Sequence, residues 1–181
     1  MGVQSSFGFT LGRMEKGRLN KITDVPGVRV GHVTRHEGGI NTGVTAILPH
    51  TGDMFHDKCP AACHVINGFG KSIGLVQVNE LGTIETPLLL TNTLSVGTAA
   101  TALVKYMLER NEDIGCDTGT VNPMVFECND GHLNDIRGLH VTEQNALDAL
   151  ANAADDFEEG AVGAGSGMSC YSLKGGIGSA S

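Results

Sequence analysis

The chain has 181 residues, a formal net charge of −8 at pH 7, 26 glycines and no tryptophan. That length is typical of one domain with a real hydrophobic core. The negative charge, without a visible basic face, argues against a nucleic-acid partner. No apolar run approaches the ~18 residues of a membrane span, and the N-terminus has no signal-peptide pattern. The glycines stand among aliphatic residues, which indicates tight turns rather than disorder.

The five cysteines are an odd number and include no C-x-x-C pair. This pattern is typical of free thiols in a reducing compartment, and it does not resemble a disulfide framework. We therefore expect a cytoplasmic protein.

The first part of the chain predicts an N-terminal arm followed by a β-hairpin. Residues 1–19 are interpreted as the arm, in which glycines flank a short charged stretch. Residues 24–27, Asp-Val-Pro-Gly, form a turn signal. A first strand begins at Val28, and a second is predicted over residues 43–48, ended by Pro49. Two short strands separated by turn residues indicate a hairpin.

Residues 50–64 gather histidine, cysteine and aspartate side chains, which are common metal ligands. Their spacing matches neither a C-x₂-C pair nor an H-E-x-x-H helix. A proline also interrupts any helix that would align the two cysteines. We expect solvated histidines and buried thiols here, and no cofactor. A metal-dependent hydrolase that uses His56, Cys63 and His64 is kept as a weaker alternative.

Residues 68–72, Gly-Phe-Gly-Lys-Ser, are superficially similar to a phosphate-binding loop. Only one residue separates the two glycines, whereas the motif G-x-x-x-x-G-K-[ST] needs four. We expect no nucleotide site.

The middle of the chain predicts an α/β fold. Residues 70–82 are consistent with a short helix that ends at Gly82. Residues 88–91 form a fully apolar run, typical of a strand covered on both faces. The clearest helix follows, with Asn92, Thr93 and Ser95 as caps. Its apolar face consists of Val96, Ala99, Ala100, Leu103 and Met107.

The last third predicts one more strand, a second helix and a glycine-rich end. The strand covers residues 121–126 and is interrupted at Pro123. The helix starts at Thr142 and Glu143, and the acidic run 155–159 is interpreted as its solvated end. Its apolar face consists of Ala146, Leu147, Leu150 and Ala153.

Residues 160–178 contain seven glycines in nineteen positions, which we interpret as strands. Strand interiors so rich in glycine are weak unless another backbone packs closely against them. The sequence therefore predicts a single domain over residues 1–181 that is part of a larger folding unit.

Residues 127–138, Glu-Cys-Asn-Asp-Gly-His-Leu-Asn-Asp-Ile-Arg-Gly, are the main candidate for a functional site. So many polar groups are costly to bury unless each finds a partner. Glu127 follows two apolar residues at a strand end, where a rigid element can aim a side chain into a pocket. For Asp130 and Gly131 alone a simple turn is the better explanation. For Glu127 the alternative is a structural ion pair with Arg137.

Six ordered segments resemble the DmpA-type aminopeptidases, the family that includes the β-peptidyl aminopeptidases. They are ITDVPGVRVGH, NTGVTAILPH, HVINGFGK, ELGTIETPLLLTNTLSVGTA, ECNDGHLNDIRG and GAGSGM…KGGIGSAS, and they extend from Asn20 to Ser181. No single segment would suffice, but their number and order make the resemblance specific.

The resemblance implies an αββα sandwich and a precursor that cuts itself into two chains. The new N-terminal Ser or Thr of the second chain is then the nucleophile, and its free α-amine can act as the base. Family members release N-terminal residues from peptides, amides or esters without a metal, and they form oligomers of the two-chain unit. This chain would be the first-chain portion, with the second chain as its partner and the nucleophile outside it.

Individual residues of the segment 127–138 are expected to have roles in such a reaction, and the position of Glu127 directly after Phe126 suggests the first of them. We expect Glu127 to pair with the protonated N-terminus of the substrate, with Asp130 beside it. Asn129 or Asn134 is expected near the reacting carbonyl, where a carboxamide can hold an oxyanion. His132 stands where similar proteins tend to carry an aromatic residue, which in relatives can help to hold the oxyanion.

Gly178-Ser179 is superficially an autoproteolysis site, which would make Ser179 the nucleophile. We favour this less, because the two residues that follow cannot form the buried strand that an N-terminal nucleophile needs. The alternative to a peptidase is a non-catalytic fragment or binding module of the same fold.

Overall fold

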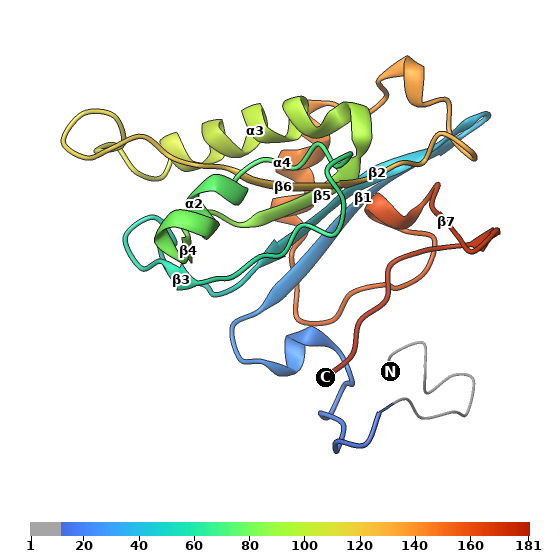
Figure 1. Ribbon diagram of the computed structural model, residues 1–181, viewed down its shortest axis with the longest axis horizontal. Coiled ribbons are helices and arrows are strands. Elements are labelled where there is room, and N and C mark those ends of the chain that lie inside the picture. Colours follow the sequence, from blue (N-terminus) through green and yellow to red (C-terminus); the bar gives the residue numbers. More distant parts are fainter. Residues whose placement is uncertain (1–11) are drawn as a thin grey trace.

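The computed structural model describes residues 12–181, and its centre is a four-stranded sheet. The strands lie in the order β1-β2-β5-β6 (Figure 1). β1 pairs antiparallel with β2, β2 antiparallel with β5, and β5 parallel with β6. Their bounds are Arg29–Glu37 for β1, Ile40–Leu48 for β2, Leu88–Asn92 for β5 and Met124–Cys128 for β6.

The predicted hairpin is confirmed as β1 and β2. Gly38, in the turn between the strands, has a φ of 57°, a left-handed conformation that glycine adopts without strain. The predicted turn at residues 24–27 is also present, because the 3-10 helix η1 (Ile22–Asp24) leads into Gly27 at a φ of 91°.

Two predicted helices, α3 (Val96–Leu108) and α4 (Glu143–Ala151), cover one face of the sheet (Figure 1). α3 is the crossover between the parallel strands β5 and β6. The whole apolar face predicted for α3 is buried. Thr142 accepts a hydrogen bond from the Asn145 backbone N–H at the start of α4, as a capping residue should. The buried apolar residues of α3 and α4 enclose an aliphatic core together with Val44, Ala46, Leu89 and Val125 of the sheet.

Smaller elements flank the sheet at the start of β5. The predicted short helix is α2 (Leu75–Leu81), and it ends at Gly82 with a φ of 66°. It leads into β4 (Thr83–Ile84), which pairs with β3 (Cys59–Pro60). Met54, Val78, Ile84 and Met124 form a second, smaller core there.

The acidic run 155–159 is not a helix end, which corrects the prediction from sequence. α4 stops at Ala151, and the chain then turns back to the edge of the sheet. Ala154 exchanges two backbone hydrogen bonds with Val30 of β1, each 3.0 Å long. The acidic run therefore lies beside β1, where Asp156 forms a 2.7 Å ion pair with the nearly buried Lys21.

The glycine-rich segment also differs from prediction, because strands form only a small part of it. It contains the 3-10 helix η4 (Gly163–Gly165) and the short strands β7 (Ser169–Cys170) and β8 (Leu173–Lys174). The expected close backbone packing is present. A Cβ added to Gly167 would lie 2.0 Å from the Asn41 carbonyl oxygen, and one added to Gly176 would lie 2.4 Å from that of Gly160.

β5 was predicted to be covered on both faces, but only its helical face is fully covered. Leu89 faces the helices and is fully buried, whereas Leu88 and Leu90 on the opposite face are half-buried. On that opposite face η4 packs against β1 and β2. Phe126 of β6, which pairs with Leu90, is half-buried as well. The sheet face over β5 and β6 is therefore less covered than the helical face.

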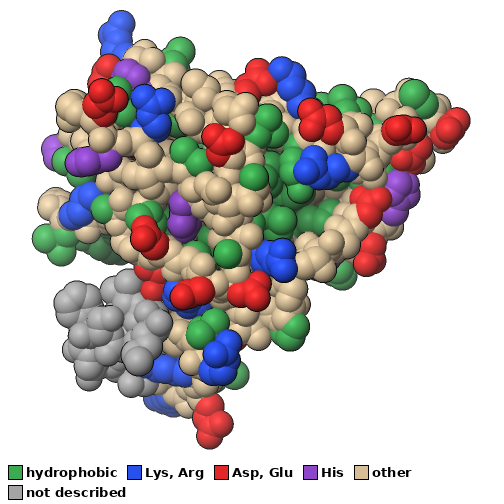
Figure 2. All heavy atoms as spheres, turned by 180° about the vertical axis from the view of Figure 1, so that it is seen from behind, with side chains coloured by type: hydrophobic (Ala, Val, Ile, Leu, Met, Phe, Trp, Pro, Cys, Tyr) green, Lys and Arg blue, Asp and Glu red, His purple; other side chains and the backbone are tan. Residues whose placement is uncertain are grey.

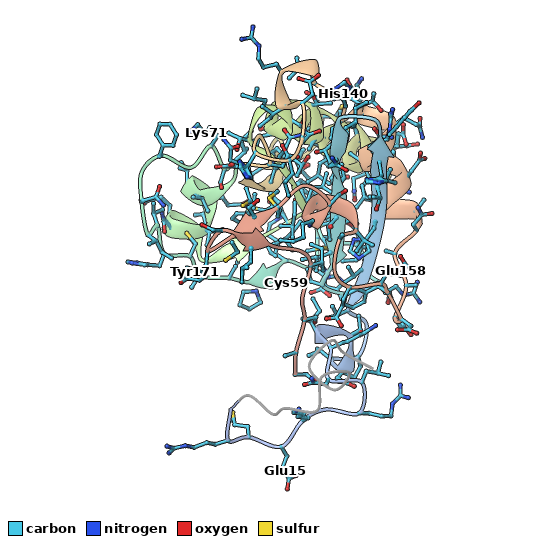
Figure 3. All side chains as sticks on the ribbon, turned by 90° about the vertical axis from the view of Figure 1, so that its right-hand side faces the viewer. Glu15, Cys59, Lys71, His140, Glu158 and Tyr171 are labelled. Atoms are coloured by element: carbon cyan, nitrogen blue, oxygen red, sulfur yellow. The ribbon has the colours of Figure 1, made fainter. Side chains whose placement is uncertain are left out.

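The described helices are all too short or too polar to cross a membrane. Of the predicted arm, residues 1–11 lie outside the described part, and Figure 3 shows the segment that carries Glu15 projecting from the body of the molecule.

The loop after β2 is held to the loop after α3 by one histidine. The His56 ring nitrogens lie 2.6 Å from Asp53 Oδ2 and 2.9 Å from Asp113 Oδ2. Hydrogen bonds to Asp53 and then to Asp113 raise the pKa of His56 above its ordinary 6.5. A histidine with a raised pKa stabilises the fold fully below pH 6.5, and this stabilisation is lost as the pH rises through the folded-state pKa.

We therefore predict that His56→Gln lowers the urea midpoint more at about pH 5.5 than at about pH 8.5. The matched control is His64→Gln, because His64 is exposed and has no hydrogen-bond partner among residues 12–181. Equal losses for His56→Gln at both pH values would contradict the prediction.

Candidate active site

The candidate site lies at the carboxyl ends of the parallel strands β5 and β6, where α3 begins. Thr91 pairs there with Glu127, and Asn92 with Cys128. In open α/β sheets, ligands bind in the crevice at this edge, because the connecting loops diverge there. The 3-10 turn η2 (Thr93–Ser95) joins β5 to α3 beside it.

Glu127 is held in place by hydrogen bonds but has no cationic partner among residues 12–181. Its Oε2 accepts a hydrogen bond from the Thr93 hydroxyl, and its Oε1 accepts one from the Lys71 backbone N–H at 3.3 Å. The Lys71 ammonium turns away and donates to the Phe69 carbonyl. The ion pair with Arg137, the sequence-based alternative, is not formed. A fixed, half-buried carboxylate of this kind can receive an ammonium group.

Glu127 lines a cavity of about 640 Å³. The apolar part of its wall comes from the loop at residues 65–69, from Leu75 and from Phe126. Thr93 and Asn129 add polar groups next to Glu127. A largely apolar wall with a few convergent polar groups is typical of a small-molecule pocket.

A second hollow of about 320 Å³ shares Phe126, Glu127 and Cys128 with the first. It lies over the less covered sheet face, between Leu90 and the glycine-rich segment that carries Met168. Lys71 belongs to the loop that borders the first hollow, and Tyr171 belongs to the segment that borders the second. Figure 3 shows both residues on the same side of the molecule. Glu127 thus stands where both hollows meet.

Cys128 is the thiol next to Glu127 that lines both hollows, and its chemistry argues against a nucleophile. Desolvation raises the pKa of Cys128, and the carboxylates of Glu127 and Asp130 raise it further. The thiol therefore stays protonated near neutral pH, while thiolate is the reactive form.

Asp130 and Asn134 lie on the other side of the loop, in a buried network. Asp130 Oδ2 accepts a 2.6 Å hydrogen bond from the Thr42 hydroxyl, and its Oδ1 accepts a 3.0 Å bond from the Asn134 amide. The Asn134 Oδ1 accepts from the Asn41 backbone N–H at 3.0 Å. Asn92 donates to the Thr42 hydroxyl at 2.9 Å, which connects the network to the turn before α3. These groups fix the loop and do not line the cavity that holds Glu127.

Asn129 and His132 are the other two predicted site residues. Asn129 accepts a hydrogen bond from the Gly131 backbone N–H at 2.9 Å, while its amide N–H₂ has no partner among residues 12–181. It lines the 640 Å³ cavity together with Glu127. His132 is exposed and lines neither of the two hollows.

Sequence reasoning missed Thr93 and Thr42 as parts of the site. Thr93 was assigned only as a helix cap, although its place directly after an apolar strand marks the edge where ligands bind. Thr42 has no local signal, because its partner Asp130 is 88 positions away.

The residues of the weaker metal alternative are not gathered into a site. His56 is engaged by two aspartates, and the Cys63 thiol donates to the Asn79 side chain. Within residues 12–181, no group of three or more His, Cys, Asp or Glu side chains is placed to hold a metal ion.

Curated relatives match nearly the whole chain. The β-peptidyl aminopeptidase BapA of Sphingosinicella microcystinivorans is 39% identical over 175 residues, which cover 91% of this chain and 43% of that protein. An uncharacterised aminopeptidase of Mycobacterium tuberculosis (strain H37Rv) is 29% identical over 173 residues, which cover 90% of this chain and 48% of that protein. The chain thus spans about half the length of these relatives or less.

Solved structures share the fold. The PH0078 protein of Pyrococcus horikoshii OT3 is 54% identical with a TM-score of 0.92, over 96% of this chain and 52% of that one. A β-aminopeptidase of a Burkholderia species is 44% identical with a TM-score of 0.86, over 96% and 50%.

The L-aminopeptidase D-Ala-esterase/amidase of Ochrobactrum anthropi, described as a prototype of the serine aminopeptidases and a variant of the Ntn hydrolase fold, is 35% identical. Its TM-score is 0.84, over 94% of this chain and 50% of that one. The fold is therefore part of the DmpA-type Ntn hydrolase fold, in agreement with the αββα class expected from sequence. The sequence profile of peptidase family S58 matches residues 20–181, so the chain belongs to that family.

Proposed function

We propose that this chain is the first-chain portion of a self-processing aminopeptidase or amidase whose nucleophile lies outside residues 1–181. The observation that carries the proposal is the Glu127 carboxylate, which is held by Thr93 and Lys71, lines a largely apolar cavity and lacks a cationic partner within residues 12–181. An ammonium group at the N-terminus of a peptide, amide or ester would form an ion pair with this carboxylate. The names of the relatives support the same substrate class.

A second chain of the same precursor is the proposed partner. The chain spans about half of its structural neighbours, and its sheet has helices on one face and half-buried Leu88, Leu90 and Phe126 on the other. In an αββα sandwich a second sheet would cover this face and complete the core. The 320 Å³ hollow would then lie between the two sheets, next to Glu127. We also propose that such two-chain units assemble into homo-oligomers and act in the cytoplasm without a cofactor.

The proposed reaction is acyl transfer to an N-terminal Ser or Thr. The free α-amine of that residue, with a reference pKa of ~7.7–8.0, can take the hydroxyl proton near neutral pH. The tetrahedral intermediate then needs a donor for its oxyanion. Of the two asparagines considered, the geometry favours Asn129, because it lines the cavity and its amide N–H₂ has no partner among residues 12–181. Asn134 and Asp130 would act as positioning residues, and His132 stays a candidate donor that the second chain would have to bring into reach.

Ser179 has contacts that suit an anchor better than a nucleophile. Its hydroxyl accepts a 2.7 Å hydrogen bond from the Ile22 backbone N–H, and its own N–H donates to Glu159 at 2.7 Å. Ser181 is tied to Asp24 by a 2.6 Å hydrogen bond in the same place. This end of the segment is therefore fixed to the turn near Asp24, on the side of the molecule where Figure 1 marks the C-terminus.

The first prediction from the proposed function concerns Glu127. Glu127→Gln should raise the KM for free-amine substrates at least about tenfold, because a charge-assisted pair becomes a neutral contact. The melting temperature should change little, since glutamine can still accept from Thr93. Glu80→Gln, an exposed change on α2, serves as the control and should leave KM unchanged. A collapse in melting temperature with an unchanged KM would refute the substrate role.

The second prediction separates the two asparagines. Asn134→Ala leaves an oxygen of the buried Asp130 carboxylate and the Asn41 N–H without partners, which should cost about 1–3 kcal/mol of unfolding free energy. Asn129→Ala should leave stability nearly unchanged and lower kcat by ~10²-fold if its amide holds the oxyanion. Urea unfolding and steady-state kinetics measure the two effects. A loss of kcat below about threefold for Asn129→Ala would exclude it as the donor.

The third prediction tests the proposed function itself. Residues 1–181 alone should show no peptidase activity, and addition of the nucleophile-bearing chain should restore it. The length of the complete reading frame and mass spectrometry of its product will show whether a second chain is made. In the complete product, Ser179→Ala should still be processed. Peptidase activity in purified residues 1–181 that is lost on Ser179→Ala would instead make Ser179 the nucleophile.

A further inference from the structure

A third hollow, of about 340 Å³, lies at the end of the sheet away from Glu127. It is bordered by the first residue of β1, the last residue of β2, the residue before β5 and the end of α3. Glu127 pairs with the far end of β5, so the strand separates the two regions. Figure 2 shows hydrophobic side chains gathered in a hollow on one face of the molecule, with basic and acidic side chains on its border.

The floor of this hollow is apolar. Leu48, Met54, Pro87 and Met107 line it, and they come from four different segments of the chain. Met54 and Met107 are almost completely buried, at 4% and 2% exposure. Such a floor can hold the apolar body of a small ligand without rearrangement.

Two guanidinium groups stand at the rim. The Arg110 guanidinium lies 3.6 Å from the centre of the Tyr106 ring and donates to the Tyr106 carbonyl at 3.1 Å, which fixes its position. The Arg29 Nε lies 3.4 Å from Asp155. Arg110 also lies 3.9 Å from Glu109, but both acidic side chains are at least 70% exposed, so solvent screens these pairs strongly. The remaining N–H groups of both arginines have no partner among residues 12–181.

Two other titratable groups in the wall, Asp53 and His50, are already engaged. Asp53 accepts hydrogen bonds from the His56 ring and from the Phe55 backbone N–H. The His50 ring accepts from the Gly52 N–H and contacts the Asp57 carbonyl, so both of its nitrogens are used. Among residues 12–181, the two arginines are therefore the cationic groups in this wall with N–H donors left to meet a ligand, and the Tyr106 hydroxyl stands beside Arg110 without a partner.

We propose that this hollow binds a small carboxylate with an apolar body, held between Arg29 and Arg110. The planar guanidinium presents paired N–H groups that match a carboxylate, and a volume of about 340 Å³ is at the lower end of ligand pockets. Asp53, the carboxylate that lines the hollow, favours a monoanion over a phosphate dianion, because the second charge would add to the repulsion. This inference does not rest on the proposed peptidase function.

Titration calorimetry on the complete protein with sodium benzoate tests the proposal. We expect benzoate to bind at least about tenfold more tightly than acetate, which lacks an apolar body, and more tightly than phenyl phosphate. Arg110→Gln and Arg29→Gln should each weaken benzoate binding about tenfold or more, and Arg110→Lys by less. Lys105→Gln is the matched control, because Lys105 lies on α3 but pairs with Glu143 at 2.6 Å.

Several results would overturn the proposal. Benzoate that fails to bind, or that binds both Arg→Gln variants as well as the unaltered protein, excludes the arginine site. Acetate binding as tight as benzoate excludes the apolar floor, and tighter binding of phenyl phosphate excludes the carboxylate. Circular dichroism of each variant separates lost binding from lost folding, and the charge-preserving Arg110→Lys gives a second measurement at the same position.

Discussion

The buried carboxylate of Asp130 is the constraint on which the site depends. It is 1% exposed, and both of its oxygens are satisfied, one by Thr42 and one by Asn134. A buried carboxylate without such partners would be strongly destabilising. Thr42 in turn accepts from Asn92, whose side-chain oxygen caps the turn that starts α3. One connected set of hydrogen bonds therefore joins β2, the end of β5, the start of α3 and the loop after β6.

Close backbone contact is the second constraint. A Cβ on Gly31 of β1 would lie 2.2 Å from the Ala149 carbonyl oxygen of α4, and one on Gly43 of β2 would lie 2.6 Å from that of Gly163. Glycine thus lets α4 and the glycine-rich segment approach opposite faces of the same hairpin. At these glycines no side chain separates the two backbones. The layers therefore lie close together and can pack tightly with few aromatic residues. The high glycine content is a packing requirement of the layers.

The two sheet faces differ in a way that fits half of a larger fold. The helical face buries Leu89 and Val125 completely, whereas Leu90 and Phe126, one position further along each strand, stay half-buried. Alternation along a strand places these residues on opposite faces. Glu127 follows at the edge where both faces end, so its carboxylate can serve a pocket formed partly by this chain and partly by a second sheet. Because Glu127 lies at this edge and not in the middle of the sheet, its carboxylate can face a pocket although the rest of the strand is apolar.

Local patterns determined the elements and the family of this protein. The hairpin, the Asn92 cap of the turn before α3, the Thr142 cap of α4, the end of α2 at Gly82 and the buried face of α3 were predicted from sequence. The predicted caps Thr93 and Ser95 do not form, because the Thr93 hydroxyl donates to Glu127 and the Ser95 side chain makes no capping hydrogen bond. Local patterns failed where a distant segment decides. Residues 155–159 leave the helix, since Ala154 bonds to Val30 of β1. Residues 160–178 form strands only in part, and η4 within them packs on β1 and β2.

The polar segment that begins at Glu127, near the end of β6, shows the division most clearly. The sequence identified Glu127, Asn129, Asp130 and Asn134 as one cluster, since it could see only their spacing. The tertiary structure placed Glu127 and Asn129 at a cavity and turned Asp130 and Asn134 into the interior. The physical reason is that each buried polar group must find a partner, and the partner of Asp130 is Thr42, on a strand 88 positions away.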